Sequence, residues 1–219
     1  MVWAGVGLPS AIAVVIGGVV VQTGWNLYRY RDHVRVRDTL PLFFLRVLAL
    51  PVGIVLLGVL VSYGPGRVKQ AIGLMLLLVL ALQWVLKVRP RERVGWGWTV
   101  LAGCASGLTA GLVGMGGPPV VLWVMAHDWP AKRARAFLWA TFLMLVPVNA
   151  GLLVWKFGGG MGWPMLLGLC LAPLVVVGSE AGMRAGGLMS RQRLRVAAFG
   201  LLVLLALGSL LGPLFSATG

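Results

Sequence analysis

The stretch Gly111-Leu-Val-Gly-Met-Gly-Gly-Pro-Pro119 interrupts an apolar run at residues 97–127 and decides how this chain folds. We name residues 111–119 the Gly-Pro break. Its four glycines and two prolines are incompatible with a continuous helix, because glycine is conformationally free and proline lacks an amide hydrogen. In a membrane, a broken backbone is tolerated only where it is buried in protein or lines an aqueous cavity. Free amides at the start of the following half-helix favour an anion, so the break predicts a transporter of a small anionic solute.

The composition predicts an all-α polytopic membrane protein. Hydrophobic residues make up 59% of the 219 positions, only five residues are acidic, and the mean hydropathy is +0.94. No soluble domain could cover so much apolar surface. The net charge of +14 would suggest nucleic acid in a soluble protein, but here the charges lie in short clusters between apolar runs, as in membrane loops. The expected partners are therefore the lipid bilayer and a small anionic solute, without nucleic acid; a homo-oligomer is left open.

Seven apolar runs are separated by short loops, and each unbroken run is about the 20 residues that a helix needs to cross a bilayer. The runs therefore predict a protein that passes through a membrane several times. The runs cover residues 8–28, 40–62, 68–87, 97–127, 134–156, 163–183 and 194–215.

The basic clusters predict how the run at 97–127 crosses the membrane. If it crossed once, the four clusters would divide evenly between the two sides; if it enters and returns, all four lie on the cytoplasmic side. Because basic residues accumulate in cytoplasmic loops, the second arrangement is favoured. The run is therefore expected to form a broken or re-entrant helical hairpin. The clusters are Arg29, Arg31, Arg35, Arg37; Lys87, Arg89, Arg91, Arg93; Lys132, Arg133, Arg135; and Arg184, Arg191, Arg193, Arg195.

An internal repeat is indicated by matching residues at a nearly constant offset. Asn26 and Asn149 are 123 residues apart, as are Pro41 and Pro164. The basic loops swap places between the two copies, which predicts an inverted repeat, as in many secondary transporters. We expect a partial first repeat of three transmembrane helices at 1–95, and a second repeat at 96–219 with the broken hairpin plus three transmembrane helices. The counterpart of the hairpin would fall before Met1, so the first helical element of the N-terminal half is expected to be missing.

The Gly-Pro break, followed by Trp129-Pro-Ala-Lys-Arg-Ala-Arg-Ala136, resembles the second half of the TauE/SafE sulfite exporter family. The resemblance implies two homologous membrane halves, each opening with a Gly-x-Gly-Gly-Pro-like motif. It also implies a permease that moves sulfite, sulfonates or related organic anions across the bacterial inner membrane. The motif residues carried over are Gly114, Gly116, Gly117 and Pro118.

Other candidate substrate-binding residues are the amide of Val120 and three polar side chains within apolar runs, namely Asn26, Thr141 and Asn149. Polar groups at membrane depth are costly and often functional. Valine in place of Gly117 is expected to crowd the predicted anion site and to force unfavourable backbone dihedral angles. Two alternatives stay open: the glycines could serve only close helix packing, and the asparagines could serve only as hydrogen bonds between helices.

The remaining polar residues predict no catalytic and no metal site. Two histidines, two cysteines and five acids form no metal-ligand pattern, and no cofactor motif or catalytic triad appears, so the chain is not expected to be an enzyme. Arg46, early in the second apolar run, is expected to extend its side chain to the cytoplasmic surface. The alternative to a permease is a non-transporting membrane component that packs with a complete partner subunit.

Overall fold

The structure is a computed structural model that describes residues 7–86, 94–188, 200, 203–204 and 206–209. Within these residues the regular elements are helices, without a strand, and two short 3-10 helices, Arg31–His33 and Gly159–Met161, follow α1 and α6. The α-helices are α1 (Leu8–Tyr30), α2 (Val36–Ser62), α3 (Pro65–Leu86), α4 (Trp96–Val113), α5 (Gly117–Met125), α6 (Ala131–Phe157), α7 (Gly162–Cys170) and α8 (Ala172–Leu188).

Four helices of the described chain are long and apolar enough to cross a membrane: α1 with its following turn, α2, α4 and α6. A fifth span is formed if the α7–α8 pair, bent by 47° at a short break, is counted as one. The prediction of an all-α polytopic membrane protein is thereby confirmed. Most of the predicted run at 194–215 lies outside the described residues.

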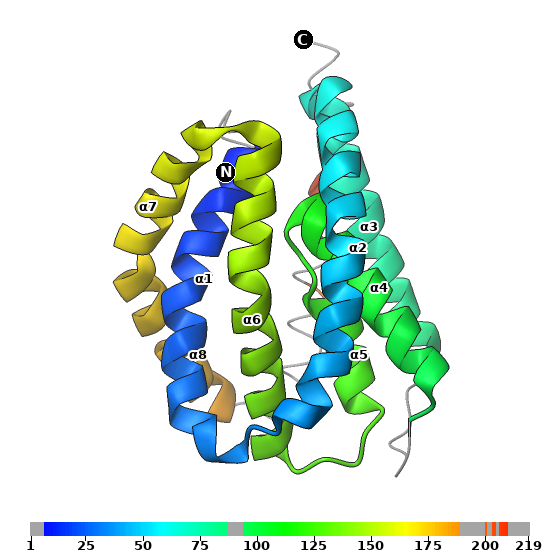
Figure 1. The fold of residues 1–219 in the computed structure, drawn as a ribbon, viewed down its shortest axis with the longest axis vertical. Coiled ribbons are helices and arrows are strands. Elements are labelled where there is room, and N and C mark those ends of the chain that lie inside the picture. The colour runs from blue at the N-terminus through cyan, green and yellow to red at the C-terminus, as the bar shows by residue number, and fades with distance from the viewer. Residues whose placement is uncertain (1–6, 87–93, 189–199, 201–202, 205, 210–219) are drawn as a thin grey trace.

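The helices lie in two groups, α1, α6, α7 and α8 beside α2, α3, α4 and α5, and α6 faces α2 across the boundary (Figure 1). α6 packs against α1 and also against α2, while α7 and α8 cover the far side of α1. α2 packs along α4, and α5 runs beside both α4 and α6. The Gly-Pro break between α4 and α5 lies beside α1, α2 and α6, since its glycines approach Ile12, Arg46 and Phe142.

Glycine allows α2 and α4 to pack with their backbones in contact. A Cβ atom on Gly107 would collide with the backbone carbonyl of Arg46, and one on Gly111 would lie 2.5 Å from the carbonyl of Leu50. Gly17 and Gly168 bring α1 and α7 equally close. The packing alternative is therefore correct for Gly111, because small residues let membrane helices approach closely. Gly114, Gly116 and Gly117 do not lie against the α2 backbone in this way.

α4 and α5 form the hairpin that the charge pattern predicted. The indole Nε1 of Trp123, near the end of α5, donates a hydrogen bond of 3.0 Å to Oγ1 of Thr99, near the start of α4. α5 therefore runs back along α4, and its nine residues are far fewer than a single span requires.

Three of the basic clusters meet at one end of the bundle in the described chain. Arg133 forms an ion pair with Asp38, and Arg135 donates a hydrogen bond to Tyr30. Glu180 lies 3.4 Å from Arg29 and 3.9 Å from Arg184. The basic residues at 87–93 and 191–195 lie outside the described residues. The inverted repeat, with α1 matching α6 and α2 matching α7–α8, stays a prediction, as does the division at 95/96.

Candidate functional site

The Gly-Pro break begins at a left-handed residue. Gly114 has φ +73°, and its amide donates a hydrogen bond of 3.0 Å to the carbonyl of Ala110, which ends α4. Only glycine adopts this conformation at low cost. The next amide, of Met115, donates to the carbonyl of Thr109. The chain then turns, and α5 starts at Gly117 with Pro118 and Pro119 in its first turn.

The turn leaves two backbone donors at the start of α5. Among the described residues, the amides of Gly116 and Gly117 have no backbone or side-chain acceptor. The first amides of any helix lack partners inside that helix, and their dipoles favour a negative charge. Ser106 of α4 fixes the turn, because its hydroxyl donates a short hydrogen bond to the carbonyl of Gly116. The break is therefore a rigid turn that presents free amides to its surroundings.

Two glycines of the turn differ in the space around them. A Cβ on Gly116 would lie 2.8 Å from the carbonyl oxygen of Ser106 and 3.1 Å from Nη2 of Arg46. A Cβ on Gly117 would meet only Phe142, at 3.8 Å. The predicted dihedral strain at Gly117 is wrong, since the positive φ of the break belongs to Gly114. Gly117 instead faces open space, and a larger side chain there would enter a cavity.

That cavity has a volume of about 400 Å³ and lies between the break, α1 and α6. Most of its walls are apolar or aromatic, from Val15, Ile16 and Val19 of α1 and from Trp139, Phe142, Leu145 and Val146 of α6. The polar residues of the wall are Gln22, Thr23, Arg46 and Asn149, and the break contributes Gly114, Met115, Gly116, Gly117 and Pro118. A mostly apolar wall with a few converging polar groups is the usual construction of a small-molecule site.

Arg46 supplies the positive charge of this wall. The expectation that its side chain extends to the cytoplasmic surface is wrong: Arg46 is 1% exposed. Its Nη1 donates a hydrogen bond of 3.1 Å to the carbonyl of Thr141, and its guanidinium carbon lies 5.3 Å from the centre of the Phe142 ring. Within the described chain, it forms an ion pair with no carboxylate. An arginine within an apolar run was itself a signal of function, because charges at membrane depth are rarely retained without one.

Unsatisfied polar atoms gather at the same place. Four buried side-chain atoms of the described chain have no hydrogen-bond partner, and three of them, Thr23 Oγ1, Arg46 Nε and Asn149 Oδ1, belong to residues that line the cavity. Thr23 is fully buried and Asn149 is 8% exposed. Buried polar groups nearly always have partners, so the gathering of three such atoms around one cavity distinguishes it from the rest of the described interior.

The cavity unites most of the predicted binding residues but not all of them. Gly114, Gly116, Gly117, Pro118 and Asn149 lie in its wall. The other three lie outside the wall. The side chain of Val120 is buried in a cluster with Leu42 and Trp123. Asn26 donates to the carbonyl of Gln22, and the hydroxyl of Thr141 donates to the carbonyl of Phe137. Thr141 still touches the site through its carbonyl, which holds Arg46.

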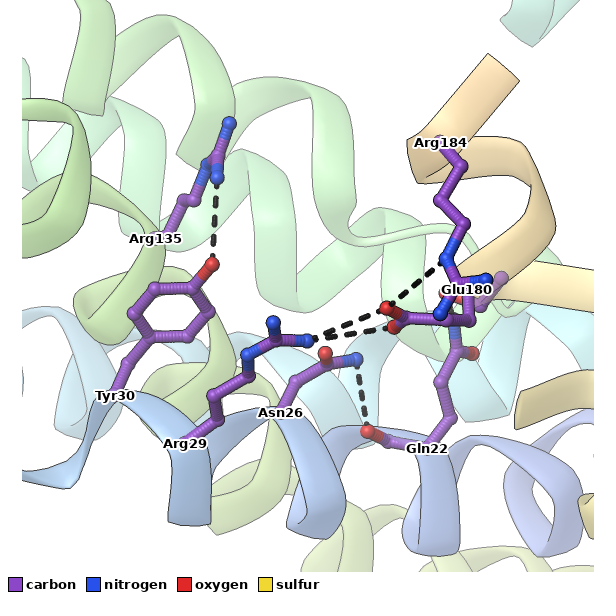
Figure 2. A network of polar contacts seen from close by, with 8 residues as sticks. Gln22, Asn26, Arg29, Tyr30, Arg135, Glu180 and Arg184 are labelled. Atoms are coloured by element: carbon purple, nitrogen blue, oxygen red, sulfur yellow. Dashed lines mark hydrogen bonds and ion pairs between the residues drawn. The ribbon is translucent and has the colours of Figure 1, made fainter. Parts of the chain in front are cut away.

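A polar network joins α1 to α8 at the end where the basic clusters meet (Figure 2). Glu180 lies between Arg29 and Arg184, and Arg135 of α6 reaches the hydroxyl of Tyr30. These groups are largely exposed, so each ion pair contributes little to stability. Gln22 belongs to both regions, because it lines the cavity and donates a hydrogen bond of 2.9 Å to Ser179 of α8.

The end of α5 and the loop after it contribute to an aromatic cluster of Trp123, His127, Trp129 and Phe137. Trp123 stacks on Phe137 with the ring centres 5.0 Å apart, and His127 lies 4.1 Å from Trp123. Burial in this cluster lowers the pKa of His127, against the opposing effect of a hydrogen bond to the carbonyl of Trp123. Arg133, which forms an ion pair of 2.6 Å with Asp38, lies over the ring of Trp129 in this cluster.

The polar groups of the cavity wall are of kinds that can bind an anion. Its wall offers a guanidinium, backbone amides and neutral polar groups, and it contains no carboxylate, histidine or cysteine among the described residues. Among the described residues, no three histidine, cysteine or acidic side chains lie together so that they could hold a metal ion. Guanidinium groups and helix N-termini both bind oxyanions well.

Comparison with known proteins identifies the family. The family model described as "Sulfite exporter TauE/SafE" matches residues 1–209. Neither the curated proteins nor the solved structures that were searched gave a significant match. The match spans nearly the whole chain, including the break, the cavity and the helices around them. The chain therefore belongs to the TauE/SafE sulfite exporter family, a family of membrane transporters of anions.

Proposed function

We propose that this protein is a permease of a bacterial inner membrane that moves sulfite, a sulfonate or a related organic anion. In this proposal the anion binds in the cavity, between the guanidinium of Arg46 and the free amides of Gly116 and Gly117. One observation carries the proposal: a buried arginine without a carboxylate partner in the described chain lines the same cavity as the Gly-Pro break.

A buried arginine is energetically costly in a membrane protein. A charged side chain at membrane depth is unfavourable by about 2.5–3.5 kcal/mol even on the mildest scale, unless another group compensates it. The Thr141 carbonyl and the Phe142 ring compensate it only in part, because neither carries a net charge. An oxyanion would complete the compensation, since the planar guanidinium can donate two parallel hydrogen bonds to it.

The neighbouring groups suit the same ligand. The amides of Gly116 and Gly117 add donors and a favourable dipole. Thr23 has a hydroxyl that can donate, and Asn149 has an amide that can turn its donor toward an anion, because the two ends of an amide are nearly the same in shape. Alternating access would expose this site to each side in turn as the helix groups rock about it.

Transport into reconstituted vesicles tests the proposal. Uptake of radiolabelled sulfite and methanesulfonate is measured for the parent and for Gly117→Val, which fills the cavity without straining φ. Gly151→Val is the matched control, because Gly151 lies on α6 and a Cβ there has no neighbour within 4 Å. We expect Gly117→Val to lose uptake by about tenfold or more, equivalent to about 1.4 kcal/mol, while Gly151→Val resembles the parent.

Two outcomes would count against the proposal. If Gly117→Val inserts normally and transports like the parent, the site is misplaced. If the parent moves neither anion, the alternative of a non-transporting component that packs with a complete partner subunit is favoured.

A further inference from the structure

We propose that this protein exchanges anions: an anion that leaves on one side is replaced by another that returns, and net movement of a single anion is slow. The proposal rests on the proposed function, because it takes the cavity around Arg46 as the anion site. It concerns the state of the site that holds no anion, and it follows from the absence of any internal counter-ion for Arg46 in the described chain.

The described charges show why Arg46 depends on its ligand. The ion pairs found among the described residues join Arg29 and Arg184 with Glu180, Arg31 with Asp32, and Arg133 with Asp38. None of them involves Arg46, whose partners among the described residues are a neutral carbonyl and an aromatic ring. The polar neighbours in the cavity wall, Gln22, Thr23 and Asn149, do not ionise. No described group of the wall can therefore become negative when the anion leaves.

Arg46 cannot remove its own charge either. A guanidinium stays protonated in proteins under physiological conditions. The site therefore carries one positive charge when empty and is neutral when it holds a monovalent anion. This difference in net charge between the empty and the occupied site follows from the residues of the wall, and it is the same for every monovalent anion.

The difference matters when the site changes sides. Between the two open states the cavity must close and lose water. With an anion bound, a neutral pair is enclosed, and its two members compensate each other. Without an anion, a single guanidinium would be enclosed in low dielectric, which is the costlier event. The loaded protein is therefore expected to change sides much faster than the empty protein, and this is the kinetic definition of an exchanger.

Efflux from vesicles distinguishes exchange from net release. Purified protein is reconstituted, the vesicles are loaded with radiolabelled sulfite, and equal potassium with valinomycin holds the membrane potential near zero. Efflux is measured into a medium whose only anion is polymeric dextran sulfate, and into the same medium with unlabelled sulfite. Methanesulfonate, which is always monovalent, is tested in the same way. We expect efflux to be about tenfold or more faster with the external anion, a barrier difference of about 1.4 kcal/mol.

Variants of Arg46 test the cause. In Arg46→Gln the empty site is neutral, so the ratio of the two efflux rates should fall towards one even though sulfite binds more weakly. Arg46→Lys keeps the charge and should keep a ratio well above one.

Each result decides a separate point. Equal efflux of the parent into both media would overturn exchange and leave the permease intact. No protein-dependent efflux into either medium would overturn both the permease and the exchange. An inserted Arg46→Gln protein that keeps the parent's ratio would show that Arg46 is not the cause. The comparison in the parent protein needs no variant, so it holds even if a substitution prevents folding.

Discussion

The guanidinium of Arg46 donates a hydrogen bond of 3.1 Å to the backbone carbonyl of Thr141, and so ties α2 to α6 beside the cavity. The same guanidinium lies against Gly116, where a Cβ atom would be only 3.1 Å from Nη2. One side chain therefore contacts both the Gly-Pro break and the helix opposite it. Movement of α6 relative to α2 would alter the position of the positive charge in the site.

A carboxylate placed in the cavity should compete with the substrate. Asn149→Asp changes the charge with almost no change in shape, and its carboxylate would add a negative charge to the cavity that Arg46 also lines. We expect sulfite uptake to fall by about tenfold or more, and to fall less in Asn149→Ala, which only removes hydrogen-bonding groups. Initial uptake rates in vesicles with matched protein content measure both. Equal uptake in the two variants would contradict electrostatic competition.

Gly114 is the glycine of the break with a left-handed backbone, so its replacement should strain that backbone conformation. Its φ is +73°, and a Cβ there would lie 3.1 Å from Cγ1 of Ile12. Alanine in this left-handed conformation should cost about 1–2 kcal/mol of stability. Thermal unfolding in detergent measures the loss, with Gly97→Ala of α4 as the control, since a Cβ at Gly97 meets nothing within 4 Å. An unchanged melting temperature in Gly114→Ala would contradict the strain.

Accessibility labelling should place both ends of the α4–α5 hairpin on one side of the membrane. Cys104 and Cys170, which are exposed, are first replaced by serine. Single cysteines are then introduced by Arg91→Cys and Lys132→Cys, which flank the hairpin, and by Arg67→Cys as the opposite-side control. We expect the first two to react with an impermeant reagent from the same side and the third from the other. Labelling of positions 91 and 132 from opposite sides would rule out the hairpin in the membrane.

His127 should make the protein less stable in acid. Burial lowers its pKa, so the folded state holds the proton less tightly than the unfolded state does. The stabilisation by neutral His127 is complete well above the ordinary pKa of about 6.5 and is lost as the pH falls below it. His127→Phe keeps a ring in the aromatic cluster without a titrating group. The decline in melting temperature between about pH 7.5 and pH 5 should be smaller in this variant; an equal decline would assign the effect to other groups.

Local chemistry determined the features that the sequence predicted correctly. Apolar runs of bilayer length indicated membrane helices, and the glycines and prolines of 111–119 could not continue one, whatever surrounded them. The basic clusters predicted the hairpin because topology depends on which loops carry charge. These properties belong to short segments and do not require knowledge of how one helix faces another.

The composition of the site was decided by tertiary structure. Asn26, Thr141 and Asn149 looked alike as polar residues in apolar runs, yet of these three side chains only Asn149 lines the cavity, because the rotation of each helix against its neighbours selects the inward side. The direction of the Arg46 side chain was also decided by tertiary structure. The sequence allowed this side chain to reach the surface, whereas the close packing of α2 on the glycines of α4, together with the Thr141 carbonyl of α6, directs it inward. Sequence fixes where a helix breaks and which loops are charged, because those effects are local. Only packing determines which side chains share a cavity, because that depends on residues from five different helices.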